Sequence, residues 1–208
     1  NNLGVVLGKN EQYEEAEKIL KQVIQSQPDF VEALNNLGSI LTCMEKYEES
    51  KAILNRSIEI HPSNAEGLSN LGDIYRKLHE YEYAVDHYKR AIQIKPNYYE
   101  ALNGMGLALT ELKKYGEAKD ILKQAIKINP KFAEAYNNLG LYYEKLNEYG
   151  QAVDYYKRAI QIKSNNYEAL NNMGLALTEL KKYDEAKEAL KQAIKINPKF
   201  AEAYNNLG

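Results

Sequence analysis

Residues 133–166 read AEAYNNLGLYYEKLNEYGQAVDYYKRAIQIKSNN, and the pattern of these 34 residues indicates the fold class. With Ala133 numbered as repeat position 1, small or apolar residues fall at positions 4, 7, 8 and 11, which is the spacing of one face of an α-helix. A second stripe of this kind occupies positions 20, 24, 27 and 28. The polar residues 147–150 separate the two stripes. The stretch therefore predicts two helices of about 14 residues joined by a tight turn.

The spacing of proline and glycine indicates that this unit recurs along the chain. Pro28, Pro62, Pro96 and Pro130 are 34 residues apart, and Pro198 follows at twice that distance. Glycine has the same period, each time after Leu or Met, at Gly4, Gly38, Gly72, Gly106, Gly140, Gly174 and Gly208. A fixed period of this length is typical of stacked repeats. Proline cannot continue a helix and so ends each hairpin. The sequence has no turn signal between alternating apolar runs, so no strand is predicted.

A unit with Leu-Gly at positions 7 and 8, Ala at 20 and 27 and, in most repeats, Pro at 32 resembles the tetratricopeptide repeat (TPR). The resemblance covers the whole chain as a single array over residues 1–208. It implies an all-α fold in which helix-turn-helix hairpins stack into a right-handed superhelical solenoid, each repeat contacting its neighbours. The implied repeats are 1–30, 31–64, 65–98, 99–132, 133–166 and 167–200, with a partial repeat at 201–208.

The small residues of the unit predict close packing. Glycine at position 8 and alanine at position 20 allow the two helices of a hairpin to approach, and alanine at position 27 does the same toward the next hairpin. The second repeat has Ser50 and Ser57 at the two alanine positions, where we expect the geometry to survive at the expense of an apolar contact alone. We expect four tyrosines to lie in the core with their hydroxyl groups directed outward, namely Tyr75, Tyr88, Tyr143 and Tyr156.

A second period, twice as long, is also present. Residues 99–132 and 167–200 differ at four positions, which are Gly104/Asn172, Gly116/Asp184, Asp120/Glu188 and Ile121/Ala189. The working unit is therefore a pair of repeats, which indicates a recent duplication or a sequence close to a consensus. Units this similar are expected to bind similar ligands at a regular spacing, or to bind nothing in a sequence-specific way.

The resemblance also implies that a peptide binds on the concave face of the superhelix, lined by the first helix of each repeat. Positions 2, 5, 6, 9, 12 and 13 form one stripe on that helix. The candidate peptide-binding residues at position 2 are Glu32, Glu66, Glu100, Glu134 and Glu168. Those at positions 5 and 6 are Asn35, Asn36, Asn70, Asn103, Asn137, Asn138, Asn171 and Asn172, with Asn1 and Asn2 in the first repeat. Those at position 9 are Ser39, Asp73, Leu107, Leu141 and Leu175.

The asparagines form a ladder with a clear chemical use. Each amide offers two donors and an acceptor oxygen, so a row of them can pair with the backbone of an extended peptide whatever its sequence. The ladder is similar to that of the repeat arm of O-linked N-acetylglucosamine transferase. The alternative is structural, because Asn-Asn-Leu-Gly is close to the family consensus.

The glutamates at position 2 also have two interpretations. A carboxylate in the first turn of a helix interacts favourably with the helix dipole by about 0.3–1 kcal/mol, which is sufficient to explain them. Alternatively, they make the groove acidic, so that it attracts basic peptides. Position 9 changes from polar in repeats two and three to leucine in repeats four to six, which predicts a patch for an apolar side chain of the ligand.

Charge and motif content exclude several classes of function. The chain has 27 basic and 29 acidic residues, so no overall field attracts nucleic acid or an anionic membrane. A single cysteine, Cys43, precludes a disulfide within the chain, and His61, His79 and His87 lack the spacing of metal ligands. No P-loop, G-x-S-x-G or H-E-x-x-H motif is present. We therefore predict no enzymatic activity, no metal and no cofactor.

One known mode of TPR recognition is disfavoured. The resemblance includes co-chaperone domains that hold a C-terminal carboxylate with Lys and Arg beside Asn, but positions 5 and 6 here carry no basic residue. Arg76 and Lys77 are the only paired cations of the stripe. A carboxylate there would be repelled by Glu66 and Asp73.

Three hypotheses for function remain. The first is a scaffold that binds a protein or peptide partner, basic or extended, in the concave groove. The second is a substrate-recruiting or regulatory arm of a larger enzyme such as a glycosyltransferase, and the third is end-to-end self-association of the superhelix. The chain lacks an initiator methionine and a signal peptide, so we expect part of a longer protein with an intracellular, cytoplasmic location.

Overall fold

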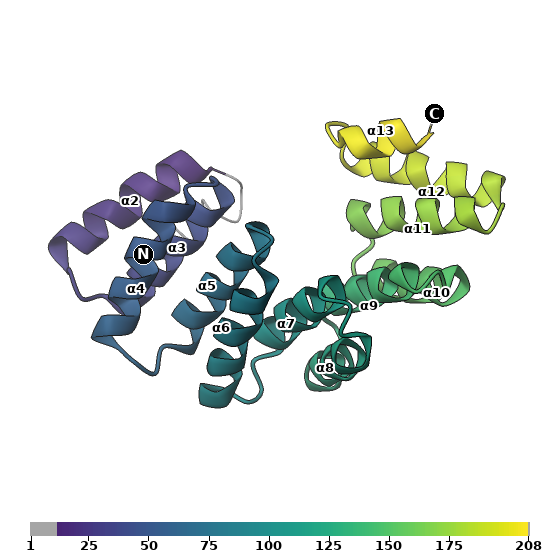
Figure 1. Ribbon diagram of the computed structural model, residues 1–208. Coiled ribbons are helices and arrows are strands. Elements are labelled where there is room, and N and C mark those ends of the chain that lie inside the picture. Colours follow the sequence, from purple (N-terminus) through teal and green to yellow (C-terminus); the bar gives the residue numbers. More distant parts are fainter. Residues whose placement is uncertain (1–11, 208) are drawn as a thin grey trace. The chain divides into compact units, whose positions relative to one another are not determined.

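The computed structural model describes residues 12–207, and this part of the chain is helical without any strand (Figure 1). Its twelve helices are α2 (Tyr13–Ser26), α3 (Val31–Cys43), α4 (Tyr47–Ile60), α5 (Ala65–Lys77), α6 (Tyr81–Ile94), α7 (Tyr99–Glu111), α8 (Tyr115–Ile128), α9 (Ala133–Lys145), α10 (Tyr149–Ile162), α11 (Tyr167–Glu179), α12 (Tyr183–Ile196) and α13 (Ala201–Leu207). Of these helices, none within residues 12–207 has the length and apolar character needed to cross a membrane.

The 34-residue period of the sequence is also the period of the structure. In each complete repeat an A helix occupies positions 1–13 and a B helix occupies positions 17–30. The A helices are α3, α5, α7, α9 and α11, with α13 beginning the next repeat, and the B helices are α2, α4, α6, α8, α10 and α12. The prediction of helix pairs is confirmed, but the turn in the fifth repeat was placed too late. It consists of residues 146–148, because Tyr149 and Gly150 already belong to the first turn of α10.

The turn between the A and B helices depends on one residue in the left-handed backbone region. Position 15 has a positive φ in five repeats, at Glu45, His79, Lys113, Asn147 and Lys181. In each case the backbone N–H of position 16 donates a hydrogen bond to the carbonyl oxygen of position 11. An example is the bond from Lys182 to Leu177 at 2.9 Å. This is the bond that closes a Schellman motif at a helix C-terminus. Most of these side chains therefore lie at a position that favours glycine.

Replacing Lys181 with glycine should stabilise the chain by up to about 1 kcal/mol. The left-handed conformation costs an L-residue roughly 1–2 kcal/mol, and glycine avoids this cost while losing somewhat more entropy on folding. Urea unfolding followed by circular dichroism measures the change. Asn147→Gly is the matched control and should change stability less, since asparagine tolerates this conformation. A lower stability of the Lys181→Gly chain would contradict the assignment.

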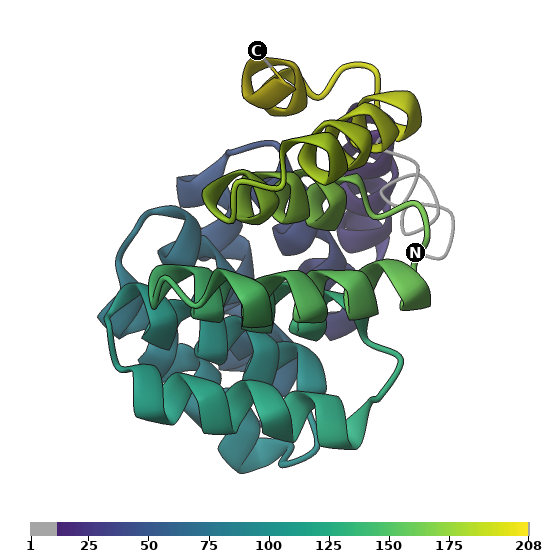
Figure 2. The same cartoon turned by 90° about the vertical axis from the view of Figure 1, so that its right-hand side faces the viewer.

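The chain divides into two compact units, Asn1–Ala108 and Leu109–Gly208, which we describe separately. In the first unit, consecutive helices from α2 to α6 pack against each other, and the A helices α3 and α5 are also in contact. In the second unit α8 to α13 do the same, and α9, α11 and α13 form the corresponding row of A helices. Figure 2 shows this order in the second unit, where α11, α12 and α13 follow one another. The single array over the whole chain stays a prediction.

Glycine at position 8 allows the two helices of a hairpin to touch. A Cβ atom added to Gly72 would lie 2.7 Å from the ring of Tyr88 on the partner B helix, and one added to Gly174 would lie 2.7 Å from Leu190. Distances this short force a neighbour to move. Alanine at position 27 serves the next interface, since Ala193 lies in one apolar cluster with Ala203 of the following hairpin. The sequence prediction is confirmed for glycine at position 8 and for alanine at position 27 at these residues.

The prediction for the two serines of the second repeat is wrong in one respect. Ser50 is buried and donates a hydrogen bond to the carbonyl oxygen of Gly38 at 2.6 Å, and it also contacts the hydroxyl group of Thr42 at 2.9 Å. Ser57 is buried and donates to the side-chain oxygen of Asn35 at 2.7 Å. The serines thus replace an apolar contact with hydrogen bonds, because both hydroxyl groups lie within reach of A-helix acceptors.

Candidate functional site

Two position-5 asparagines are buried within the repeats. Asn35 and Asn171 are each 2% exposed. The amide nitrogen of Asn35 donates to the side-chain oxygen of Asn64 at 3.1 Å, and the Asn64 amide donates back at 2.8 Å. Asn64 also caps α5 by accepting a hydrogen bond from the N–H of Gly67 at 3.0 Å. This network links the second repeat to the start of the third and leaves Asn35 little surface to offer a peptide.

Asparagines at position 6 connect successive A helices. Asn172 donates to the side-chain oxygen of Asn137 at 3.4 Å, and Asn206 donates to that of Asn171 at 2.9 Å. Asn70 donates to the backbone oxygen of Asn35 at 3.3 Å. Each bond runs from position 6 of one repeat to position 5 of the repeat before it. These hydrogen bonds therefore link neighbouring A helices, which agrees with the structural alternative for the asparagine ladder.

The remaining polar residues of the ladder have different degrees of exposure. Asn36, Asn70, Asn103, Asn137 and Asn172 are half-buried, whereas Asn138 is buried. The predicted first-repeat members Asn1 and Asn2 lie outside the described residues.

The position-2 glutamates lie at the surface. All of them within residues 12–207 are exposed, namely Glu32, Glu66, Glu100, Glu134, Glu168 and Glu202. Glu134 pairs with Lys163 at 3.5 Å, and Glu66 accepts a hydrogen bond from Asn35 at 3.4 Å. Burial raises the pKa of the Tyr98 hydroxyl, and the nearby carboxylates of Glu66 and Glu100 raise it further. The carboxylates of two neighbouring repeats thus act on the same hydroxyl group.

Position 9 is polar in repeats two and three and apolar in repeats four to six. Ser39 is exposed, and Asp73 is half-buried and paired with Arg76 at 3.3 Å. The leucines of this position are all half-buried, at Leu107, Leu141 and Leu175. Arg76, one of the two paired cations of the stripe, thus forms an ion pair with the position-9 residue of its own helix.

The hydroxyl groups of Tyr88 and Tyr156 are not directed outward, so the prediction is wrong for these two of the four tyrosines. Tyr88 and Tyr156 are fully buried. Tyr88 donates to a side-chain oxygen of Asp73 at 2.7 Å, and Tyr156 donates to Glu144 at 2.8 Å. Burial raises the pKa of both tyrosines, and the facing carboxylates add to this effect. An A-helix carboxylate serves as the acceptor because the buried ring reaches across the hairpin.

Gly104 marks where the ladder is interrupted. It stands at position 6, where most repeats have asparagine. A Cβ atom at Gly104 would lie 2.5 Å from the ring of Tyr88, which approaches from the preceding repeat. Tyr88 in this orientation therefore requires glycine at the facing position.

Sequence reasoning missed two kinds of residue. Asn64 and Asn166 stand at position 34, which is aromatic in the other repeats, and each caps the following A helix through its side chain. Their preference for helix N-termini was the available signal. The second kind is a set of aromatic and lysine contacts on the B-helix side, such as the stacked rings of Tyr143 and Tyr155, 5.2 Å apart.

The reactive side chains form no centre in the described part of the chain. Cys43 is exposed, as are His61 and His79, and His87 bonds to the backbone oxygen of Tyr83 at 2.9 Å. Residues 12–207 contain no group of three side chains able to hold a metal ion.

Comparison with known proteins identifies this arrangement of stacked helical hairpins. Family profiles described as tetratricopeptide repeat match residues 1–27, 29–97, 63–131, 133–166 and 167–200. The chain belongs to the tetratricopeptide repeat family. A search by sequence among curated proteins finds no match.

Solved structures agree with this family. A chain of the APC/C hetero-tetramer Cut9-Hcn1 is similar with a TM-score of 0.86 and 16% identity, over 97% of this chain and 40% of that chain. TTC0263, a thermophilic TPR protein in Thermus thermophilus, has a TM-score of 0.78 and 21% identity, over 85% and 96%. YrrB, a TPR protein with an unusual peptide-binding site, has a TM-score of 0.57 and 19% identity, over 89% and 96%. At these identities the likeness shows the fold.

Proposed function

We propose that this chain is a non-catalytic protein-interaction scaffold, and that it binds an extended basic peptide along the exposed side of its A helices. The observation that carries the proposal is the regular recurrence of an exposed glutamate at position 2 beside asparagine at position 6. A set of groups repeated at the pitch of the helices suits a ligand that is itself regular, such as an extended backbone. The description of YrrB as a peptide-binding TPR protein supports this use of the fold.

Positions 2 and 9 and the half-buried asparagines of the ladder would make the contacts, since Asn35 and Asn171 at position 5 and Asn138 at position 6 are buried. An amide nitrogen carries two N–H groups, so Asn172 can donate to Asn137 and also to a peptide carbonyl. The carboxylates of Glu134 and Glu168 are exposed and would attract lysine or arginine side chains of the peptide. Leu141 and Leu175 are half-buried and would contact an apolar side chain of the same ligand.

A chain with both Glu134→Gln and Glu168→Gln is expected to bind lysine-containing peptides about tenfold more weakly, because each exposed charge contributes about 0.5–1 kcal/mol. A peptide array selects the probe, and fluorescence anisotropy with the selected lysine-containing peptide measures its dissociation constant. Added salt should weaken binding to the native chain more than to the variant, because screening acts on the removed charges.

The matched control carries Glu117→Gln and Asp154→Asn, which remove two exposed charges from the B helices of the same unit. The control should bind like the native chain. Equal weakening in both double variants would mean that net charge alone acts and would refute the A-helix site. Melting curves confirm that all chains remain folded, since the position-2 carboxylates also contribute about 0.3–1 kcal/mol through the helix dipole.

A further inference from the structure

On the B-helix side, a surface site is formed by positions 11 and 23 of a repeat together with position 21 of the repeat before it, and its side chains differ between the third, fifth and sixth repeats. In the third repeat, Tyr75 at position 11 packs against His87 at position 23, with ring centroids 4.9 Å apart. Lys51 of the preceding repeat lies 5.9 Å from the centre of the Tyr75 ring. The His87 ring thus occupies position 23 of this repeat, and the Lys51 ammonium group lies near the face of the adjacent Tyr75 ring.

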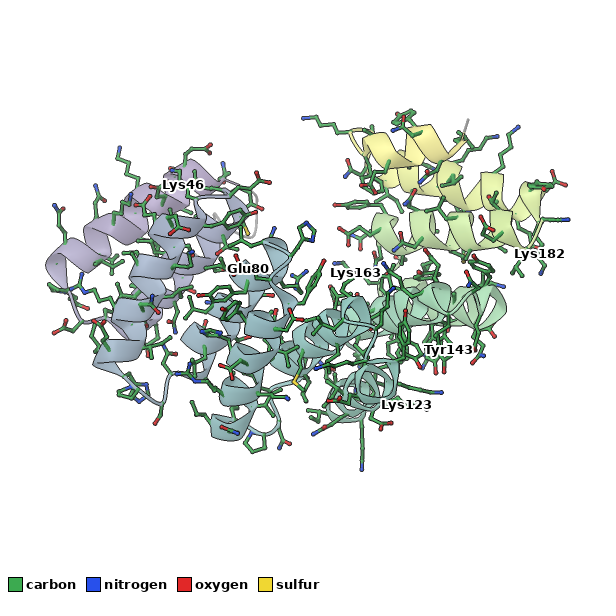
Figure 3. The ribbon with its side chains drawn as sticks, in the orientation of Figure 1. Lys46, Glu80, Lys123, Tyr143, Lys163 and Lys182 are labelled. Atoms are coloured by element: carbon green, nitrogen blue, oxygen red, sulfur yellow. The ribbon has the colours of Figure 1, made fainter. Side chains whose placement is uncertain are left out.

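The fifth repeat has the same arrangement. Tyr143, labelled on α9 in Figure 3, stacks on Tyr155 at 5.2 Å with an angle of 14° between the rings. Lys119 of the preceding repeat lies 5.4 Å from the centre of the Tyr143 ring. In the third and fifth repeats, this surface site is therefore occupied by two rings, at positions 11 and 23, and by a lysine of the preceding repeat.

In the sixth repeat, the same surface site has neither the two rings nor the lysine. Leu177 replaces the tyrosine of position 11, Ala189 replaces the ring of position 23, and Val153 replaces the lysine of the preceding repeat. The result is a surface pocket of about 430 Å³, whose apolar floor is formed by Met173, Leu177 and Ala189. Ala189 is smaller than any other residue at this position within the full repeats, which explains why the pocket opens here.

The rim of the pocket is acidic. Asp184, Glu185 and Glu188 of α12 line it, and Lys157 of α10 is the basic residue that lines it. Three carboxylates and one ammonium group give a formal charge of −2 at neutral pH. Lys182, labelled at the start of α12 in Figure 3, lies 3.6 Å from Glu185, and Gln192 donates to Glu188 at 3.2 Å.

The differences between the two near-identical repeats converge on this pocket. Repeats four and six differ at four positions, and three of the residues in repeat six line it, namely Asp184, Glu188 and Ala189. Their counterparts are Gly116, Asp120 and Ile121. The changes remove apolar volume from the floor, add one negative charge to the rim, and lengthen another acidic side chain.

We propose that this pocket binds an arginine side chain of a partner protein. The aliphatic stem and flat face of arginine suit the floor of Met173, Leu177 and Ala189, where other repeats place flat rings. Its guanidinium group would donate to the rim carboxylates, and it is less strongly hydrated than the ammonium group of lysine. The site is separate from the proposed peptide face, because positions 7 and 11 lie on the side of α11 opposite positions 2, 6 and 9.

The test uses the full chain and small probes. The chain has three methionines, so the ε-methyl resonance of Met173 can be followed by NMR, with Met44 and Met105 as internal references. N-acetyl-arginine amide should shift the Met173 resonance saturably and leave the other two in place. N-acetyl-citrulline amide has a similar shape without the charge and should bind at least about tenfold more weakly, since one charge-assisted hydrogen bond contributes about that factor.

Variants copied from repeat four provide matched controls. Ala189→Ile fills the pocket with the residue that the near-identical repeat accepts as Ile121, and it should abolish the shift. Asp184→Gly copies Gly116 and should weaken arginine binding severalfold while leaving the floor intact. Ile121→Ala alone, without the added charge, should not create a site of equal affinity.

Four results would overturn the proposal, and the first three concern the Met173 resonance and the Ala189→Ile chain. They are the absence of a Met173 shift with N-acetyl-arginine amide, an equal shift with the citrulline derivative, and unchanged binding in the folded Ala189→Ile chain. Equal affinity for N-acetyl-lysine amide would also refute it, because the selection of arginine rests on a planar cation over an apolar floor. The Glu134 and Glu168 variants should leave this binding unchanged, which separates it from the A-helix proposal.

Discussion

Gly140→Ala is expected to destabilise the chain by roughly 1–3 kcal/mol, the usual cost of overpacking a well-packed interface. The added Cβ atom would meet the ring of Tyr156, which is fully buried and donates its hydroxyl hydrogen to Glu144. The ring cannot withdraw without loss of this hydrogen bond and of its packing against α9. Urea unfolding measured by circular dichroism, together with hydrogen exchange of the α9 and α10 amides, gives the change.

Gly150→Ala in the same repeat is the matched control and should have the opposite sign. No atom lies within 4 Å of a Cβ added to Gly150, which is exposed in the first turn of α10. Alanine is preferred to glycine within a helix by about 0.5–1 kcal/mol, so this variant should be more stable than the native chain. Similar effects from the two substitutions would mean that helix propensity, rather than the contact with Tyr156, governs position 8.

Asn35→Ala is expected to cost about 2 kcal/mol, within the range of roughly 1–3 kcal/mol for a buried polar group that loses its partner. The substitution removes both hydrogen bonds exchanged with Asn64 and the acceptor of Ser57. All three side chains are buried, so water cannot readily replace the missing partner. The effect should be largest for the hydrogen-exchange protection of α3, α4 and α5.

Ser57→Ala separates the network from simple packing. It installs the alanine that the other full repeats have at position 27, and Asn35 still accepts a hydrogen bond from Asn64. The loss should therefore be smaller than that of Asn35→Ala. A cost as large as that of Asn35→Ala would show that the hydroxyl group, and not the pair of amides, stabilises this junction. The double variant Asn35→Ala with Asn64→Ala should cost less than the sum of the two single variants, because each removes the same bonds.

The helix pairs were predictable because two separate signals agreed on them. Glycine at position 8 and alanine at positions 20 and 27 recur in phase, and they marked the contacts that the structure shows at Gly72 and Ala193. Proline and the joint between the stripes marked the ends of helices. The turn at Asn147 was predicted too far along the chain because polar residues and glycine also occur in the first turn of a B helix. Composition therefore does not distinguish the turn from the start of that helix.

The candidate site was less predictable. The stripe of positions 2, 5, 6 and 9 follows from helical geometry, and the exposure of the position-2 glutamates agrees with it. Helical spacing could not show that Asn35 is buried by Asn64, since the two residues are 29 positions apart and meet only when hairpins stack. The hydroxyl group of Tyr88 was misplaced for the same reason, because Asp73 lies on the other helix of the hairpin.

The amino-acid sequence alone determined that the chain consists of 34-residue helical hairpins, which residues keep their helices close, and which side of each A helix carries the asparagines and glutamates. Periodicity suffices for this, since the position of a residue around a helix follows from its number. The packing of the hairpins establishes which polar groups form hydrogen bonds with one another and where a small side chain such as Ala189 leaves a pocket. These features depend on side chains from several helices. The sizes and directions of these side chains determine a contact or a pocket only after the hairpins have packed.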